Sequence, residues 1–404
     1  MKIGIFTNNY LPNPYGVSGS IESFRKQFEA SGHRVFIFAP RWKGYKDENP
    51  NACPPSAAPS GAGRRVFRYP SVDIKFKIRF PLAIPYSREL DRVISKLDLD
   101  IIHSQHPNLL GTAALKWARK KNIPLVFTWH TLYNQYAHFA KFIPKKIAAG
   151  YMIKKAVRYA NQCDQIIVPT ESVKEIIRKW GVDNENIEAI PTGVEEEFYQ
   201  NADRNLMRKK YNIKDGEVLL LLVSRLTAEK NVEFLFHALT PTLSKRERKI
   251  RFLVVGGGYL LEKFKKFVIK ENIGDKVIFA GVIEKNKIKN YYAAGDIFVY
   301  ASKSETQGMI ISEAMYSGLP IVAVNAPGIR DLVENKVNGF LVSEDKNEFA
   351  EAVNKLIEDK NLREKFGRES GRIAREKYTD KVCAEKMMEI YRKAIENYDL
   401  RFRN

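Results

Sequence analysis

Short apolar segments alternate with helical patterns along most of this chain, and this alternation limits the possible folds more than any other feature. Apolar runs at 2–6, 101–102, 125–128 and 165–168 are each followed by a loop and a segment of helical periodicity. A further apolar run covers 35–39. Repeated units of this kind form a parallel sheet with helices on both faces. The first half is therefore predicted to be a doubly wound α/β domain.

The pattern pauses near 191–194 and restarts with the most apolar run in the chain, Val218 to Ser224. Further strands are predicted at 252–255, 277–280, 297–301 and 321–323. A length of 404 residues also favours two domains of roughly 200 residues each. We expect one Rossmann-like domain at 1–193 joined by the last helix, about 380–404, and a second at 194–379. Two such sheets facing across a cleft would bind ligands at the carboxyl ends of their strands. Residues 49–63, rich in Pro, Ser, Ala and Gly, predict a loop.

Positive charge is concentrated in the first half. The formal charge is +20, and residues 1–180 hold 29 Lys/Arg against 12 Asp/Glu. This asymmetry indicates an anionic partner: a membrane surface, a nucleic acid or a phosphorylated substrate. The three cysteines form no CxxC pair, and the first residues are too short an apolar run for a signal peptide. Both features favour a reducing, cytoplasmic location.

The segment SETQGMIISEAM, residues 304–315, carries two candidate carboxylates. Glu305 is expected in the loop before a helix that starts near Gly308, and Glu313 in the second turn of that helix. The amides of Gly308, Met309 and Ile310 would suit a diphosphate. A carboxylate can accept two sugar hydroxyls side by side. Taken alone, however, the spacing describes a solvated helix face equally well.

Two cations follow the apolar strand at 218–223. Arg225 and Lys230 flank its carboxyl end, where they could neutralise a diphosphate leaving group, or lie on the surface as ordinary solvated cations. Glycine-rich turns follow two further strands, at 256–258 and before Val282. Such turns are weak evidence of function by themselves.

The first domain offers fewer signals. Gly16 lies in the first βα loop, where a glycine lets the backbone approach a ligand, but the GxGxxG dinucleotide fingerprint is absent. His130 follows the strand at 125–128 and could bind a sugar hydroxyl, transfer a proton or have a purely structural role. His103 is expected to pack beneath the cleft.

A helix at 144–163 is predicted to have one core face and one face that mixes cations with large apolar groups. The second face suits a membrane interface, although aromatic and basic residues also occur together on nucleic-acid surfaces and half of the aromatics could belong to the core. The candidate membrane-binding residues are Lys141, Lys145, Lys146, Ile147, Tyr151, Lys154, Lys155 and Arg158.

Taken in order along the chain, these pieces resemble the retaining glycosyltransferases of family 4, which have the two-domain GT-B architecture. The resemblance rests on the following segments: Gly16-Val, Gly32-His-Arg-Val35, Asp100-Ile-Ile-His103, Ser224-Arg-Leu, Glu229-Lys-Asn231, Glu305 to Met315, and Asn338-Gly-Phe. The segments Phe127-Thr-Trp-His-Thr-Leu-Tyr133 and Ser304-Glu-Thr-Gln-Gly look most like the bacterial branch that glucosylates diacylglycerol. Gln105 departs from the pattern, since many relatives carry histidine there.

The resemblance implies a role for each candidate residue. Glu313 would hold the ribose of a nucleotide sugar and Glu305 the transferred sugar, with His130 beside it. Arg225, Lys230 and the amides near Gly308 would hold the diphosphate, which Gly16 would approach from the other domain. The backbone near Val282 would contact the base. No metal-ligand cluster such as DxD is evident, so metal-independent chemistry without a tightly bound cofactor is expected.

The implied function is transfer of a hexose, with retention, from UDP-glucose to a membrane lipid such as 1,2-diacylglycerol at the cytoplasmic face of the membrane. The alternative is a soluble or peripheral family 4 enzyme using another donor, such as GDP-mannose, and a phosphorylated, polyprenyl or carbohydrate acceptor. A nucleic-acid-binding protein with an inactive transferase fold is a third hypothesis. Intact Arg225, Lys230, Glu305 and Glu313 argue against it, and no nucleic-acid partner is expected.

Overall fold

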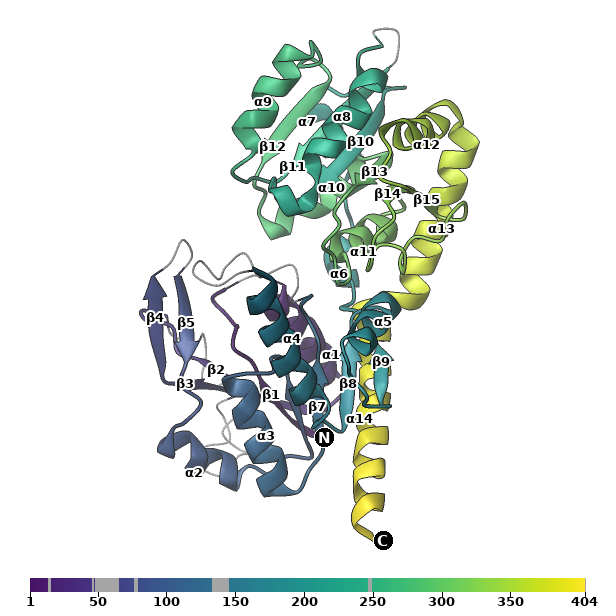
Figure 1. The fold of residues 1–404 in the computed structure, drawn as a ribbon. Helices are drawn as coiled ribbons and strands as arrows, with labels where there is room; N and C mark the ends of the chain where they lie inside the picture. Colours follow the sequence, from purple (N-terminus) through teal and green to yellow (C-terminus); the bar gives the residue numbers. More distant parts are fainter. Residues whose placement is uncertain are drawn as a thin grey trace. The chain divides into compact units, whose positions relative to one another are not determined.

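The computed structural model describes residues 1–13, 16–45, 47, 65–75, 79–132, 145–245 and 249–403. The chain divides into two compact units, one of Met1–Thr192 with Cys383–Asn404 and one of Gly193–Val382 (Figure 1). The loop predicted at 49–63 lies outside the described residues. Each unit is built on its own parallel sheet, as the alternation of apolar and helical segments predicts.

The first unit contains a seven-stranded parallel sheet in the order β3-β2-β1-β6-β7-β8-β9. Its strands are β1 (Lys2–Phe6), β2 (Arg34–Pro40), β3 (Val66–Tyr69), β6 (Ile101–Ser104), β7 (Leu125–Thr128), β8 (Gln165–Val168) and β9 (Ile187–Ala189). Its helices are α1 (Val17–Ala30), α2 (Arg88–Lys96), α3 (Leu110–Lys121), α4 (Lys145–Ala160), α5 (Glu171–Lys179) and most of α14 (Asp380–Arg403). An antiparallel hairpin, β4 (Ser71–Lys75) with β5 (Arg79–Ala83), follows β3.

The last helix belongs to the core of the first unit. Met387, Met388 and Tyr391 of α14 are buried against β-strand residues of this unit such as Ile3 and Val35. The Tyr391 hydroxyl lies 2.5 Å from Nδ1 of His103, whose Nε2 lies 2.7 Å from the Thr128 hydroxyl. His103 is thus a buried structural histidine that links α14 to β6 and β7, as expected for a residue packed within the fold.

The second unit contains a six-stranded parallel sheet in the order β12-β11-β10-β13-β14-β15. Its strands are β10 (Val218–Val223), β11 (Ile250–Val255), β12 (Val277–Gly281), β13 (Ile297–Tyr300), β14 (Ile321–Val324) and β15 (Gly339–Val342). Its helices are α6 (Glu196–Tyr199), α7 (Arg204–Lys210), α8 (Val232–Leu243), α9 (Leu261–Lys270), α10 (Ile288–Ala294), α11 (Met309–Tyr316), α12 (Lys346–Glu358) and α13 (Lys360–Lys377). Leu219 to Leu222 in β10 are fully buried, because helices cover both faces of this central strand.

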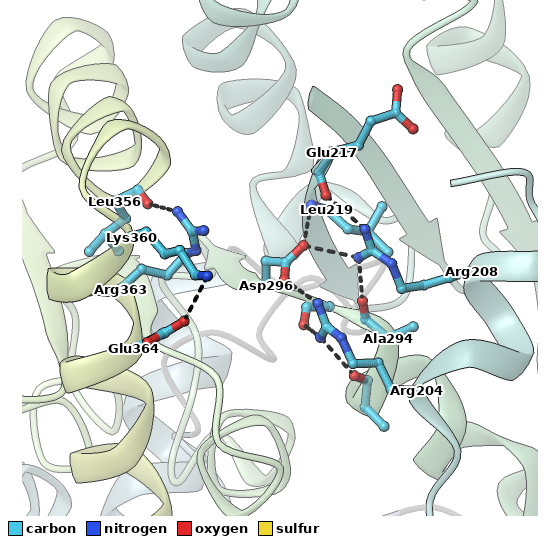
Figure 2. Close-up of polar contacts among 12 residues, drawn as sticks. Arg204, Arg208, Glu217, Leu219, Ala294, Asp296, Leu356, Lys360, Arg363 and Glu364 are labelled. Atoms are coloured by element: carbon cyan, nitrogen blue, oxygen red, sulfur yellow. Dashed lines mark hydrogen bonds and ion pairs between the residues drawn. The ribbon is translucent and has the colours of Figure 1, made fainter. Parts of the chain in front are cut away.

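An ionic network fixes the amino ends of β10 and β13 to α7 (Figure 2). Asp296 accepts from Arg204 at 2.5 Å, from Arg208 at 3.1 Å and from the Leu219 amide at 2.7 Å. Arg208 also donates to the carbonyls of Ala294 and Glu217. The side chain of Arg208 is buried in this network. Loss of Asp296 would leave its charge without a counterion and lower the free energy of unfolding by about 3–5 kcal/mol. This network lies at the edge of the sheet opposite to the carboxyl ends.

Among the described residues, no helix combines the length and the apolar character needed to cross a bilayer.

Candidate functional site

The predicted donor residues of the second unit gather along one edge of its sheet. Arg225 and Lys230 follow β10, Val282 follows β12, and the segment with Glu305 and Gly308 follows β13. The strand order reverses between β10 and β13, where crossovers leave the sheet in opposite directions. In open α/β sheets, ligands bind at the carboxyl ends of the strands beside such a reversal. The chain therefore brings these residues to the expected position for a binding site.

Lys230 and Glu305 form an ion pair at this point, with Lys230 Nζ 2.5 Å from Glu305 Oε1. The Tyr300 hydroxyl, at the end of β13, donates to the same oxygen at 2.6 Å. Burial alone would raise the pKa of Glu305, but the charge and hydrogen bond of Lys230, together with the Tyr300 and Ser302 hydroxyls, lower it overall. The pair therefore presents an ionised carboxylate beside a cation.

Glu313 lies in a different environment. It is the fifth residue of α11, and its Oε2 accepts a hydrogen bond of 2.7 Å from the buried Tyr292 hydroxyl. Burial raises the pKa of Glu313, and hydrogen bonds from Tyr292 and Tyr199 offset only part of that effect. Two carboxylates whose environments move their pKa values in opposite directions are suited to different tasks. Tyr292 and Tyr300 have the sequence pattern of ordinary core residues, so neither was predicted to belong to the site.

The backbone at the start of α11 has a conformation that leaves its first amides available to a ligand. Gly308 precedes the helix with φ 75° and ψ 53°, a left-handed conformation that favours glycine, and no side chain caps this end. The first-turn amides, which include Met309 and Ile310, have no partner inside the helix. This arrangement suits an anion.

Three glycines of the turn after β11 let the loops of this edge pack closely. A Cβ at Gly256 would lie 1.9 Å from the Ser224 carbonyl oxygen, and one at Gly258 would lie 2.3 Å from that of Leu226. These glycines thus fix the loop that carries Arg225, whose guanidinium is exposed and pairs with Glu229 at 3.3 Å. Val282, adjacent to this turn, is 82% exposed.

Gly328 is a supporting residue that sequence reasoning missed. A Cβ there would lie 2.8 Å from the Glu305 carbonyl oxygen and 2.9 Å from the Thr306 carbonyl carbon, and its φ is 79°. Any other side chain would push away the loop that holds Glu305. The preceding Pro327 makes a Pro-Gly pair, a turn signal that could have identified the position.

In the first unit, His130 lies after β7 and meets Gln105, which follows the adjacent strand β6. The Nε2 of His130 is 2.7 Å from Oε1 of Gln105, so the amide oxygen accepts the Nε2–H proton and leaves Nδ1 as the acceptor. Burial lowers the pKa of His130 to about 4. The imidazole is therefore neutral near pH 7.

Gly16 immediately precedes α1, with φ 24°, and is exposed. It lies in the loop after β1, and β1 and β6 are the strands between which the order of the first sheet reverses. The backbone N–H of Asn8, in the same loop, donates to Nδ1 of His106 at 3.1 Å. This hydrogen bond connects the loop after β1 to the segment that follows β6. Within the described ranges, no group of three His, Cys, Asp or Glu side chains is placed to hold a metal ion.

The exposed face of α4 has the composition predicted from the sequence. Ile147 and Tyr151 are 64% and 68% exposed, and Lys154, Lys155 and Arg158 are also exposed, whereas Ala148, Ala156, Tyr159 and Ala160 are buried. The helix therefore presents cations and large apolar groups on one side. Lys141 lies outside the described residues. Lys145 and Lys146 lie in α4, but their side chains are not described.

Two family models match the chain, one to each half. Residues 14–198 match "Glycosyltransferase Family 4", and residues 203–372 match "Glycosyl transferases group 1". A solved structure with a similar fold is that of Anabaena HepE in complex with UDP, with a TM-score of 0.75 at 18% identity, covering 96% of this chain and 99% of that one. The two Rossmann-like units therefore define a glycosyltransferase of the GT-B architecture.

Curated relatives make the assignment more specific. Alpha-monoglucosyldiacylglycerol synthase of Streptococcus pneumoniae is 34% identical over 356 residues, covering 84% of this chain and 75% of that protein. The protein of the same name from Acholeplasma laidlawii is 28% identical over 403 residues, covering 97% and 96%. The chain belongs to glycosyltransferase family 4. The family and the fold class inferred from the sequence are thereby confirmed.

Proposed function

We propose that this glycosyltransferase moves glucose from UDP-glucose to 1,2-diacylglycerol at a membrane surface, with retention of the anomeric configuration. The observation that carries the proposal is the Lys230–Glu305 pair at the strand reversal of the second sheet, next to the uncapped start of α11. Support for the acceptor comes from the two relatives named alpha-monoglucosyldiacylglycerol synthase. Support for a uridine donor comes from the UDP complex of a protein with this fold.

Each carboxylate has its own part in donor binding. Glu313 accepts hydrogen bonds from the two ribose hydroxyls, a contact that suits the paired oxygens of a carboxyl group. Arg225, Lys230 and the amides of Gly308, Met309 and Ile310 hold the diphosphate. In this proposal the backbone at Val282 contacts the base and Gly16 approaches the phosphates.

Glu305 and His130 act on the transferred sugar. The bond from the anomeric carbon to the diphosphate oxygen breaks while a bond to the acceptor hydroxyl forms on the same face. The departing diphosphate takes the acceptor proton, and Lys230 and Arg225 stabilise the charge that develops on it. The ionised Glu305 stabilises the positive charge that develops on the sugar ring. His130, held neutral by burial, hydrogen-bonds a sugar hydroxyl through Nδ1.

Lys230 and Arg225 provide the positive charge that a metal ion would otherwise supply to the diphosphate, so we propose a reaction without a metal ion. Transfer should therefore persist in the presence of a chelator. Loss of transfer that only a divalent ion restores would contradict this part of the proposal.

The exposed face of α4 brings the enzyme to its acceptor. Diacylglycerol is confined to the bilayer, and a mixed cationic and apolar helix face suits the headgroup region of an anionic membrane. The proposal therefore includes a peripheral location, on the cytoplasmic face of the membrane.

A donor screen tests the proposal. The full chain is incubated with UDP-glucose, UDP-galactose or GDP-mannose, with and without diacylglycerol in vesicles, and free and lipid-linked sugar are measured. We expect lipid-linked glucose from UDP-glucose only when diacylglycerol is present. Preferential use of GDP-mannose, or transfer to a soluble phosphorylated acceptor instead, would favour the alternative family 4 activity.

A further inference from the structure

The hairpin of β4 and β5 turns an apolar face to solvent. Val72 and Leu82 are direct partners in the antiparallel register, so their side chains share one face, and they are 56% and 37% exposed. The next pair, Ser71 and Ala83, belongs to the opposite face, where Ala83 is only 3% exposed and belongs to the same core cluster as Phe67 of β3. A two-stranded sheet normally buries its apolar face. This one leaves aliphatic groups uncovered.

Beyond β5, every second residue of the chain is again exposed, and these exposed residues become more polar toward α2. Leu82, Ile84, Tyr86 and Arg88 are all exposed, and each residue between them is buried or partly buried. Arg88 Nε donates to the Tyr86 hydroxyl at 3.3 Å, and Lys116 Nζ lies 6.0 Å from the centre of the Tyr86 ring. Aliphatic, phenolic and cationic groups thus follow one another, which is the order from acyl chains to phosphates at a membrane interface.

The charge of this segment selects the kind of partner. Residues 71–88 carry four Lys/Arg and a single acidic residue, Asp73. A second copy of the chain docking here would place like charges opposite one another, because a twofold interface pairs a patch with itself. Anionic lipid headgroups instead complement the cations while the acyl region receives the aliphatic groups.

We propose that the exposed face of Val72, Leu82 and Ile84, bordered by Tyr86 and Arg88, inserts into the interface of an anionic bilayer as a second membrane contact besides α4. Figure 1 shows the hairpin beside β3 at the edge of the first sheet. Both elements leave the carboxyl edge of that sheet, the hairpin after β3 and α4 after β7. Four strand spacings separate β3 from β7 in the sheet order, or roughly 19 Å. Two contacts this far apart fix the tilt of the unit on the membrane, whereas a single helix would allow the unit to rotate about the helix axis.

This inference rests on the proposed function, since it concerns the same membrane-bound acceptor. Insertion is measured on the full chain with Leu82→Cys, in a Cys53→Ser background, labelled with an environment-sensitive fluorophore. Vesicles of phosphatidylglycerol and phosphatidylcholine should shift its emission to the blue, and vesicles of phosphatidylcholine alone should do so less. An unshifted label on a chain that sediments with the vesicles would overturn the hairpin contact and leave membrane binding through α4 intact.

Affinity is measured with the triple variant Val72→Ser, Leu82→Ser, Ile84→Ser. We expect its partition onto phosphatidylglycerol vesicles to fall by about tenfold or more, because three aliphatic groups no longer enter the interface. The matched control, Ile269→Ser with Val337→Ser, removes exposed aliphatic groups from the second unit and should bind normally. Donor hydrolysis without vesicles should be unchanged in the triple variant, which shows that it folds.

The remaining outcomes are also decisive. Unchanged vesicle partition of the triple variant would reject the inserted face. A wild-type dimer that the triple variant loses in the absence of lipid would assign the face to self-association instead. If wild-type chain fails to bind anionic vesicles at all, while still transferring sugar to a soluble acceptor, the proposed membrane function itself is wrong.

Discussion

The ammonium of Lys230 lies 2.5 Å from the carboxylate oxygen of Glu305 to which the Tyr300 hydroxyl also donates at 2.6 Å. One residue comes from the loop after β10 and the other from the loop after β13, the two strands that flank the reversal of the sheet. The pair connects these loops and keeps a partly buried carboxylate ionised. A structural ion pair would need only this geometry, whereas a catalytic one must also affect turnover.

Replacing Glu305 should therefore act mainly on turnover. Glu305→Gln keeps the shape but removes the negative charge, and kcat should fall by about 10²–10³ with little change in the KM for UDP-glucose. Glu376→Gln, on the exposed side of α13, is the control and should behave like the wild type. A Glu305→Gln enzyme with normal kcat would restrict the residue to a structural role.

The stability of the Glu305→Gln variant provides a second measurement. The pKa of Glu305 is lowered in the folded state, so its ionised form adds stability that is present above the ordinary glutamate pKa, about 4.3, and is lost as pH falls through the folded value. Thermal unfolding of this variant should thus differ from the wild type most at neutral pH. The difference should shrink in acid.

Glu313 should show the opposite sign. Its pKa is raised by burial, so the folded state favours the protonated form and loses stability as pH rises through the unfolded and then the folded pKa. Glu313→Gln should therefore unfold at a higher temperature than the wild type at pH 7 and at the same temperature in acid. The variant should also bind UDP about 10–100-fold more weakly, as measured by calorimetry, because charged hydrogen bonds to ribose are lost.

Exposed Glu262→Gln on α9 is the control for both measurements, with no expected effect on either. Unchanged UDP affinity in Glu313→Gln would remove this residue from the donor site. A lower unfolding temperature at pH 7 would contradict the burial argument.

Three histidines make the first unit sensitive to acid. Burial lowers the pKa of His103 and of His106 to about 3 and that of His130 to about 4. The unfolded chain takes up protons on these residues below about pH 6.5 while the folded chain does not, so stability falls as pH decreases toward 4. The slope of the unfolding free energy against pH gives the number of protons that the chain takes up on unfolding. We expect this number to approach three from these histidines.

The measurement is denaturant unfolding at a series of pH values between 7 and 4.5. His103→Gln should reduce the slope by one proton. The same reduction in His237→Gln, whose residue lies partly exposed on α8, would show that the histidines of the first unit are not responsible. A slope of zero for the wild type would contradict the buried neutral state of all three residues.

Charge reversal on α4 tests the membrane surface. The variant Lys154→Glu, Lys155→Glu, Arg158→Glu should lose at least about a hundredfold in affinity for phosphatidylglycerol vesicles, since each cation near an anionic surface contributes about 1 kcal/mol. The variant Lys265→Glu, Lys266→Glu, Lys270→Glu on α9 has the same change of net charge on an exposed helix of the second unit. If both variants lose the same affinity, net charge rather than this helix face governs binding.

The sequence predicted the two sheets because most of their strands are continuous apolar runs followed by helical segments, as at Val218 to Val223. It also predicted that Arg225, Lys230 and Glu305 follow strand ends of the second sheet, since parallel strands bring their following loops to one edge. The hairpin β4–β5 was not predicted, because Val72 and Leu82 face solvent and the two strands interrupt the βα alternation. Tyr292, Tyr300 and Gly328 escaped because their roles depend on contacts with Glu313, Glu305 and Thr306, which adjacency in sequence does not reveal.

The predicted roles of individual site residues remain predictions, as do the boundaries of the functional halves. The pKa values of Glu305 and Glu313 shift in opposite directions, and the sequence alone could not predict this difference. Both are glutamates eight positions apart, and only the surrounding cation, phenols and burial distinguish an ionised residue from one that resists ionisation.

The most direct test of the proposed activity is the anomeric configuration of the product. The full chain is incubated with UDP-glucose and vesicles of diacylglycerol and phosphatidylglycerol, and the lipid fraction is analysed by mass spectrometry and proton NMR. We expect a monoglucosyl diacylglycerol with the α configuration that glucose has in the donor. A β-linked product, or vesicles in which diacylglycerol remains unglucosylated while another acceptor is used, would contradict it.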